Sequence, residues 1–335
     1  MKRQVPTATP VTCEPSPAVT SIEINDPTAV GEDMQVIAQE AVQLEPKPLR
    51  ARRVVVRLGS SLLLLQSTNL PIRTRTTLRG GLVAYVAFGP RASGSLNGLP
   101  VGPDRVLAST SGVEVEFVVA AGYESVSLLV PPAEVRRHLG RPPGEDQHLV
   151  PKGVQLLRTS PGAGSRLFAW GRRVASAAAK YPEAFDDPRT NSVAQRELLE
   201  ILIATIGSAV VQEGAPREGT RRAYSRIVRI AEEYAITHAG EPLYLNQLCR
   251  AASVSERTLQ NAFNEIMGMS PVAYLARLRL HRLRQALRAA APRSTTVTAE
   301  ALKWGFWHLG DCSREYRECF GELPSATLRR LDRGR

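Results

Sequence analysis

One spacing of aromatic, Gly and Pro residues occurs twice near the carboxyl end of this 335-residue chain, and it constrains the fold more than any other feature. In each copy an aromatic residue lies five residues before a Gly and eight before a Pro. Gly favours the left-handed conformation that ends a helix, and Pro suits the first turn of the next helix. The spacing therefore predicts two copies of one helical unit. The copies are Phe263, Gly268 and Pro271, then Tyr316, Gly321 and Pro324.

The first copy closes a pattern typical of a helix-turn-helix, in residues 245–263. Such a motif needs apolar residues where its two helices cross, a small residue at their contact and a tight turn. Cys249 and Ser253 supply small residues, and Ser255 can cap the second helix by accepting hydrogen bonds from its first N–H groups. The apolar crossing positions are filled by Leu248, Ala252, Val254, Leu259 and Ala262.

The second copy has the same parts. Ala301 is the small contact residue, Gly305 lies at the turn, and Phe306 is expected to be the buried residue of that turn. A helix over 271–290 joins the two units. Side by side, the units would present two recognition helices to successive major-groove segments about 34 Å apart.

These residues resemble the AraC/XylS-type transcription regulators over the last third of the chain. The matching motifs are SVSERTLQNAF at 253–263, the G.SP..YL..LRL.R run at 268–282, and GFWHLG..S.EYR..FGE.PS.TLRR at 305–330. The resemblance implies a seven-helix domain that binds double-stranded promoter DNA and activates transcription with RNA polymerase, under an N-terminal sensing or dimerisation domain. The strand-rich region resembles the N-terminal domain of regulators similar to the ethanolamine-operon regulator, and no ligand is carried over from it.

The outer face of the first recognition helix is predicted to read DNA. Arg suits the O6/N7 edge of guanine, and Gln or Asn suits the N6/N7 edge of adenine. By resemblance to the family, Arg257, Gln260 and Asn261 reach base edges, while Ser255 is a cap and phosphate contact. The alternative is a solvated polar face. The predicted contacts of this helix are Ser255, Arg257, Thr258, Gln260, Asn261 and Asn264.

The second recognition helix departs from the family pattern in three places. Asp311 would repel phosphate, Cys312 replaces an aromatic residue, and Glu300 stands where an aliphatic residue is usual and must find a partner or turn outward. We therefore predict that this unit docks chiefly on phosphate and that the first unit dominates specificity. Its predicted contacts are Ser313, Arg314 and Arg317.

Basic residues are concentrated in the same part of the chain. Residues 215–335 carry 20 Lys and Arg against 12 Asp and Glu, which is +8 of the net +11. Such clustering is typical of a protein that binds a polyanion, although an Arg-rich composition alone can produce it. In the helix over 271–290 we expect some Arg residues to pair with Glu265, Glu315 or Glu318, and two or three to clamp phosphate. These are Arg277, Arg279, Arg282, Arg284 and Arg288.

The composition divides the whole chain into four segments. Residues 1–50, rich in Pro, Thr and Glu, predict a disordered tail. Residues 51–213 predict a β-rich sensing or dimerisation domain with helices, 214–222 a linker, and 223–333 the DNA-binding domain. The expected fold class is α+β, with a small antiparallel β barrel or sandwich and flanking helices, followed by an all-α domain with two helix-turn-helix units.

Short runs of apolar and β-branched residues between Arg53 and Val130 predict the strands. The run at 113–119 alternates, with Glu114 and Glu116 on a face that we expect to be wet. Such a barrel either encloses a pocket for a small-molecule effector or is purely structural. A later amphipathic helix, at 192–212, either packs against its own barrel or forms the seam of a homodimer.

Several function classes find no support in the sequence. The longest nearly apolar stretch, 198–211, is shorter than the ~20 residues that cross a bilayer, and no export signal is present, so we expect a cytoplasmic protein without a membrane partner. The four cysteines show no ligand spacing, the strand region contains no His, and no nucleophile motif or phosphate loop occurs. We therefore expect no metal, no cofactor and no enzyme.

Two alternatives to an activator stay open. One is a small-molecule-binding β-domain protein to which the helical module is an appendage. The other is a repressor or co-regulator whose impaired second unit lets it bind DNA only as a dimer or with a partner.

Overall fold

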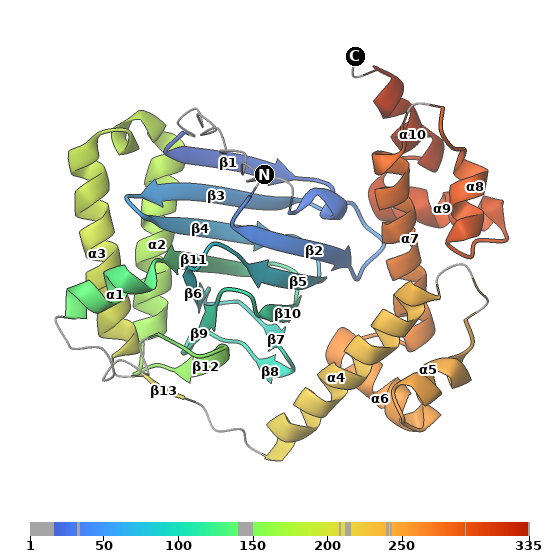
Figure 1. Ribbon diagram of the computed structural model, residues 1–335, viewed down its shortest axis with the longest axis horizontal. Coiled ribbons are helices and arrows are strands. Elements are labelled where there is room, and N and C mark those ends of the chain that lie inside the picture. Colours follow the sequence, from blue (N-terminus) through green and yellow to red (C-terminus); the bar gives the residue numbers. More distant parts are fainter. Residues whose placement is uncertain are drawn as a thin grey trace, which may run out of the picture.

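The computed structural model describes residues 17–31, 34–139, 150–207, 209–211, 216–238, 241, 243–291 and 293–333. A β-domain with flanking helices lies beside a helical domain (Figure 1). The predicted α+β fold class is therefore confirmed. Among the described helices, none has both the length and the apolar character needed to span a membrane.

The β-domain is a sandwich of two antiparallel sheets. The larger sheet has the strand order β1 (Val19–Ile24), β3 (Ala51–Leu58), β4 (Ser61–Thr68), β11 (Glu124–Val130), β6 (Val83–Phe88), β9 (Arg105–Thr110), β12 (Val154–Arg158) and β13 (Val210–Val211). The smaller sheet has the order β2 (Ile37–Gln43), β5 (Ile72–Leu78), β10 (Glu114–Val119), β7 (Gly94–Leu96) and β8 (Leu99–Pro100). Apolar side chains from both sheets, such as Val86 and Val115, form one core between them.

The predicted disordered tail over 1–50 is wrong for the part that the structure describes. Strand β1 pairs with β3 along its whole length, from Val19 opposite Val56 to Ile24 opposite Ala51. Strand β2 pairs with β5. The prolines fall outside these strands, so they do not interrupt the hydrogen bonding. Residues 1–16 of the predicted tail lie outside the described residues.

Three helices belong to the β-domain: α1 (Pro132–Leu139), α2 (Ala163–Lys180) and α3 (Pro188–Ile206). Helix α2 crosses strands of the larger sheet, and α3 packs beside it. Leu198, Leu202 and Ile206 of α3 are buried in the same core as the sheet. The apolar stripe of this helix therefore packs against its own domain, which was one of the two expected arrangements.

The helical domain has α4 (Pro216–Thr237), α5 (Leu245–Ala251), α6 (Glu256–Met267), α7 (Pro271–Ala289), α8 (Val297–Lys303), α9 (Leu309–Phe320) and α10 (Pro324–Arg333). Of the predicted linker 214–222, residues 214 and 215 lie outside the described residues, and the rest is helical, because α4 begins at Pro216. Two cores are built along α7. Leu275 and Leu278 join the core of α4 to α6, and Leu283 and Leu287 join that of α8 to α10.

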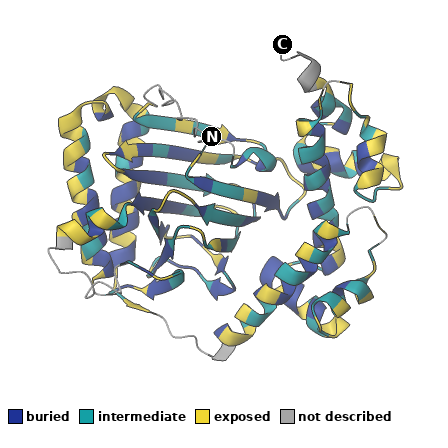
Figure 2. Cartoon of the chain, in the orientation of Figure 1, coloured by how far each residue is buried: buried dark blue, intermediate teal, exposed yellow. Residues whose placement is uncertain are grey.

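The smaller sheet and the helical domain meet at a buried, charged interface, and the buried residues are dark blue in Figure 2. Arg73 of β5 is 2% exposed and lies 2.6 Å from Glu232 of α4 and 3.5 Å from Glu116 of β10. The Tyr274 hydroxyl of α7 donates to Glu232. The expectation that Glu116 faces water is wrong, because its strand face is covered by α4, and burial raises the pKa of its carboxyl.

Candidate nucleic-acid interface

Helices α5 and α6 form the predicted helix-turn-helix. Leu248, Leu259 and Ala262 are buried where the two helices cross. Ser253 has a positive φ of 52°, and the N–H of Val254 donates to the Cys249 carbonyl at 3.0 Å, which closes the turn. Small residues at this turn therefore let α5 and α6 approach each other closely.

The first turn of α6 is capped by Ser255. Its Oγ accepts from the N–H of Thr258 at 3.2 Å and lies 2.9 Å from the Thr258 hydroxyl. At the other end Gly268 adopts φ 70° and its N–H donates to the Asn264 carbonyl. Both ends of this recognition helix are thus stabilised within its own unit, as the sequence predicts.

The polar residues predicted to read DNA share one side of α6. Arg257, Asn261 and Asn264 are exposed, while Thr258 and Gln260 are half-buried. The opposite side is buried in the core of the unit. Among the described residues Arg257 has no carboxylate partner, so its guanidinium is available to an anion or a base edge. The buried residues of that opposite side are Leu259, Phe263, Ile266 and Met267.

Helices α8 and α9 form the second unit. Ala301 and Tyr316 are fully buried, and Gly305 has a φ of 75° at the turn. Phe306 was predicted to be buried and is only partly so, although it packs against the same core. The N-cap residue of α9 is His308, whose side chain makes no capping hydrogen bond.

Two of the three departures from the family pattern are accommodated inside this unit. Glu300 is buried and accepts from Lys303 and Thr295, at 2.7 Å each. Burial alone would raise the pKa of the Glu300 carboxyl. The hydrogen bonds from Lys303 and Thr295 outweigh this effect, so the pKa lies below its usual value. Cys312 is 2% exposed and fills the space under α9, where burial raises the pKa of its thiol to about 11.

The exposed side of α9 carries fewer free cationic groups than its sequence suggests. Arg314 lies 3.0 Å from Asp311, one helical turn away, and both side chains are exposed. Arg317 is exposed and has no ion pair among the described residues, and Ser313 is half-buried. Asp311 therefore weakens the positive charge at Arg314.

The arginines of α7 pair differently from the prediction. Arg282 lies 2.9 Å from Glu40, Arg284 2.9 Å from Asp26, and Arg288 3.5 Å from Asp26. These carboxylates belong to the β-domain, and the expected partner Glu265 pairs instead with Arg221 of α4 at 3.2 Å. The prediction failed because these β-domain partners lie more than 200 residues away in the sequence and carry no local signal. Arg284 also lies 3.0 Å from Glu322, which belongs to the helical domain but was not among the predicted partners.

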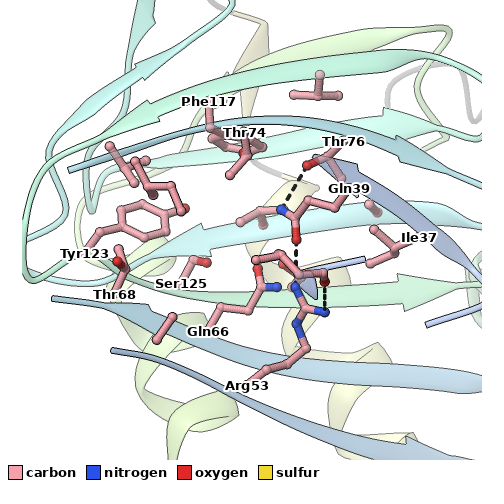
Figure 3. Close-up of a pocket in the computed structure, with 18 of the residues that line it drawn as sticks. Ile37, Gln39, Arg53, Gln66, Thr68, Thr74, Thr76, Phe117, Tyr123 and Ser125 are labelled. Carbon is pink, nitrogen blue, oxygen red and sulfur yellow. Dashed lines mark hydrogen bonds between the residues drawn. The ribbon is translucent and has the colours of Figure 1, made fainter. Parts of the chain in front are cut away.

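A cavity of about 130 Å³ lies between the two sheets of the β-domain (Figure 3). Its wall is mostly apolar, with hydroxyl groups such as those of Thr74 and Ser125 and the side-chain amide of Gln66. The buried Arg53 guanidinium at its edge donates to the Val30 carbonyl at 2.8 Å and to Gln39 at 2.7 Å. Sequence patterns did not identify the residues that line this space, because each strand contributes only alternate side chains and the pairing of the strands decides which of them face it.

The sequence of the helical domain is similar to known helix-turn-helix proteins. The helix-turn-helix domain family matches residues 248–330. The probable thc operon regulatory protein of Rhodococcus erythropolis is 41% identical over 103 residues, which is 31% of each chain. The XylDLEGF operon transcriptional activator 2 of Pseudomonas putida is 33% identical over 132 residues, which is 39% of this chain and 78% of the relative.

A solved structure of a probable AraC family transcriptional regulator from Rhodopseudomonas palustris has 39% identity, with a TM-score of 0.29. The match covers 31% of this chain and 96% of that one. The chain spans about a third of the length of several curated relatives, at 31% and 38%. The twin helix-turn-helix units and the match to the Pseudomonas putida activator 2 together show that the chain belongs to the AraC/XylS family of transcription regulators.

Proposed function

We propose that the chain binds promoter DNA and activates transcription, and that its two helix-turn-helix units contact successive major-groove segments. The observation that carries this proposal is the outer side of α6, where Arg257, Gln260 and Asn261 lie together and where no carboxylate of the described part of the chain pairs with the guanidinium. Each bidentate contact to a base is worth about 1 to 3 kcal/mol of discrimination. Contact with RNA polymerase and homodimer formation stay predictions.

The second unit is proposed to contribute affinity and little sequence choice. Arg314 lies beside Asp311, and Ser313 is half-buried, so within the described ranges Arg317 is the cation of the predicted α9 contacts that has no carboxylate partner. A guanidinium near phosphate adds attraction that does not depend on the base sequence. The first unit therefore dominates specificity in this proposal.

Selection of sites from a random DNA pool by the full chain, followed by gel shift, tests this function. We expect one enriched motif, and we expect Arg257→Ala to weaken binding to it while Arg136→Ala does not. Arg136 is exposed on α1, across the β-domain from the helical domain in Figure 1, and its loss changes the net charge equally. Absence of any enriched motif, or equal losses in the two variants, would contradict the proposal.

We further propose that the β-domain cavity takes a small, uncharged effector. A cavity of about 150 Å³ holds a benzene-sized molecule, and this one is of similar size. Charged ligands are disfavoured because N–H groups of the Arg53 guanidinium already donate to protein oxygens. Apart from Arg52, which is exposed to solvent, the other polar side chains of the lining carry hydroxyls or amides. Burying an unpaired ligand charge there would be costly.

The strands of the smaller sheet connect this cavity with the helical domain. In β5, Thr74 and Thr76 line the cavity, whereas Arg73 and Arg75 on the opposite face pair with Glu232 and Glu233 of α4. A ligand that shifts β5 therefore moves the contacts of α4. This arrangement supports regulation of DNA binding by an effector.

A thermal-shift comparison of benzyl alcohol with benzoate tests the ligand class. We expect benzyl alcohol to raise the melting temperature and benzoate to leave it unchanged, and the Ala84→Leu variant, which fills the cavity, to abolish the rise. Stabilisation by benzoate alone would show that the inferred class is wrong. Stabilisation that persists in Ala84→Leu would place the ligand elsewhere.

A further inference from the structure

The end of strand β2 lies at the border between the two cores of the helical domain. Val42 and Leu44 belong to the first core, together with Leu275 and Leu278 of α7. Successive side chains of a strand point in opposite directions, so Gln43 between them points away from that core. Three consecutive residues of the β-domain therefore contact both helix-turn-helix units.

Gln43 makes a direct contact with the second recognition helix. It is fully buried, and its Nε2 donates to the Cys319 carbonyl in the last turn of α9, at 2.8 Å. The last carbonyls of a helix have no partner inside the helix. Gln43 Nε2 also donates to the Lys47 carbonyl at 2.7 Å, and its backbone N–H donates to His281 Nε2 at 3.2 Å. A side chain of the β-domain thus caps the carboxyl end of α9.

A second link reaches the same unit through Arg284. Its Nε donates to Asp26 of the β-domain at 2.9 Å, and its Nη1 lies 3.0 Å from Glu322 and 3.1 Å from the Tyr316 hydroxyl. The guanidinium also stacks 4.6 Å from the centre of the Phe320 ring. Charge-assisted contacts of this kind are about twice as strong as neutral hydrogen bonds. The β-domain therefore holds α9 at two points.

The two recognition helices differ in how they are held. Helix α6 has its own N-cap, Ser255, within the first unit. Helix α9 lacks a side-chain cap at its N-terminus and receives a capping contact from another domain at its C-terminus. The position of α9 therefore depends more on the β-domain than the position of α6 does.

We propose that Gln43 is a positioning residue for DNA recognition. Through it, the β-domain fixes α9 relative to α6 and so sets the spacing between the two DNA segments that the chain accepts. The inference rests on the proposed function. Without this contact α9 keeps all of its DNA-facing residues, but its position is less restricted. The second DNA segment then contributes less to affinity, and wrong spacing between the segments lowers affinity less.

Full-length wild type, Gln43→Met and Gln195→Met are compared on the site that wild type selects from random DNA. Gln195→Met is the matched control, because the same change at Gln195 of α3 removes a side-chain hydrogen bond of the β-domain, to the Ser60 hydroxyl at 3.3 Å, away from the cavity and from the helical domain. Each protein is titrated against the selected site, the same site with a scrambled second segment, and the site with one or two base pairs inserted between the segments.

We expect wild type and Gln195→Met to lose affinity on the altered sites. We expect Gln43→Met to lose about two- to tenfold less, the factor that corresponds to losing the one hydrogen bond to α9, at the Cys319 carbonyl. Equal losses in all three proteins would overturn the role of Gln43 while leaving the proposed function intact. Failure of wild type to select any site would instead overturn the proposed function.

Two further measurements keep the test independent of the folding of one variant. Asp26→Asn weakens the second link to Arg284 and is expected to relax spacing in the same direction. Hydrogen exchange in Gln43→Met is expected to accelerate at the amides of 309–321 and to stay unchanged at 256–268. Equal acceleration in both recognition helices would show a general loss of stability and would overturn the positioning role.

Discussion

Replacing Arg73 by Met should destabilise the chain far more than the same change at its neighbour Arg75. Arg73 is 2% exposed and faces two carboxylates, Glu232 at 2.6 Å and Glu116 at 3.5 Å. Its loss leaves Glu232 without a cationic partner among the described residues and leaves Glu116 with only longer contacts, to Arg229 at 3.8 Å and Arg75 at 4.0 Å. Breaking a buried ion pair from one side costs about 3 to 5 kcal/mol, because the remaining charge stays desolvated.

Arg75 is the matched comparison. It lies two residues further along β5 on the same face, and its nearer partners Glu114 and Glu233 have side chains that are 45% and 47% exposed, while Glu116 lies 4.0 Å away. Exposed pairs of this kind contribute about 0 to 1 kcal/mol. Arg75→Met should therefore lower the free energy of unfolding by about 1 kcal/mol or less.

Urea unfolding followed by far-ultraviolet circular dichroism measures both variants. Adding Glu232→Gln to Arg73→Met removes one of the stranded charges, so the double variant should be more stable than Arg73→Met alone. Equal losses for Arg73→Met and Arg75→Met, or a further loss in the double variant, would refute the reasoning from burial.

Three other predictions follow from the site and the interface. Gln260→Ala should reduce base discrimination by about 1 to 3 kcal/mol in site selection, and an equally large effect of Arg314→Ala would contradict the ranking of the two units. Affinity for the selected site should fall about 100-fold between roughly 50 and 200 mM salt if four phosphates are contacted, and a flat dependence would argue against phosphate docking. Burial lowers the pKa of His281 to about 3 from its usual 6.5, so the unfolded chain binds the proton first. The free energy of unfolding should therefore fall by about 1.4 kcal/mol per pH unit as pH drops below about 6.5. His281→Gln should flatten this slope between pH 7 and 5, and an unchanged slope would assign it to other groups.

Local signals in the sequence were sufficient to predict the helical domain. Ser255 and Ser270 precede helices and cap them, and Gly268 and Gly321 end helices with positive φ. Each of these signals acts within a few residues, so a single sequence displays it. The buried and exposed sides of α6 follow from the same short-range periodicity.

Long-range contacts account for what sequence reasoning missed. Strands β1 and β2 are short and flanked by prolines, and only their pairing with β3 and β5 identifies them. Strand β5, with Arg73 and Arg75, has the composition of a solvated segment, yet its charged face packs against α4. Charges that are satisfied by another domain look like surface charges in a sequence.

The contacts of Val42, Gln43 and Leu44, at the end of β2, limit how domains of this chain can be exchanged with those of its relatives. A chimaera that joins a foreign β-domain to residues 216–335 would lack the apolar pair that completes the first core and the amide that caps α9. Exchange at the domain boundary would therefore leave the recognition residues intact and still change the spacing of the two DNA segments that the chain accepts. Transplanting the 42–48 segment together with the helical domain should preserve the DNA site that the chain selects. On this proposal, the end of β2 and the helical domain must be exchanged together between relatives, although they are far apart in the sequence.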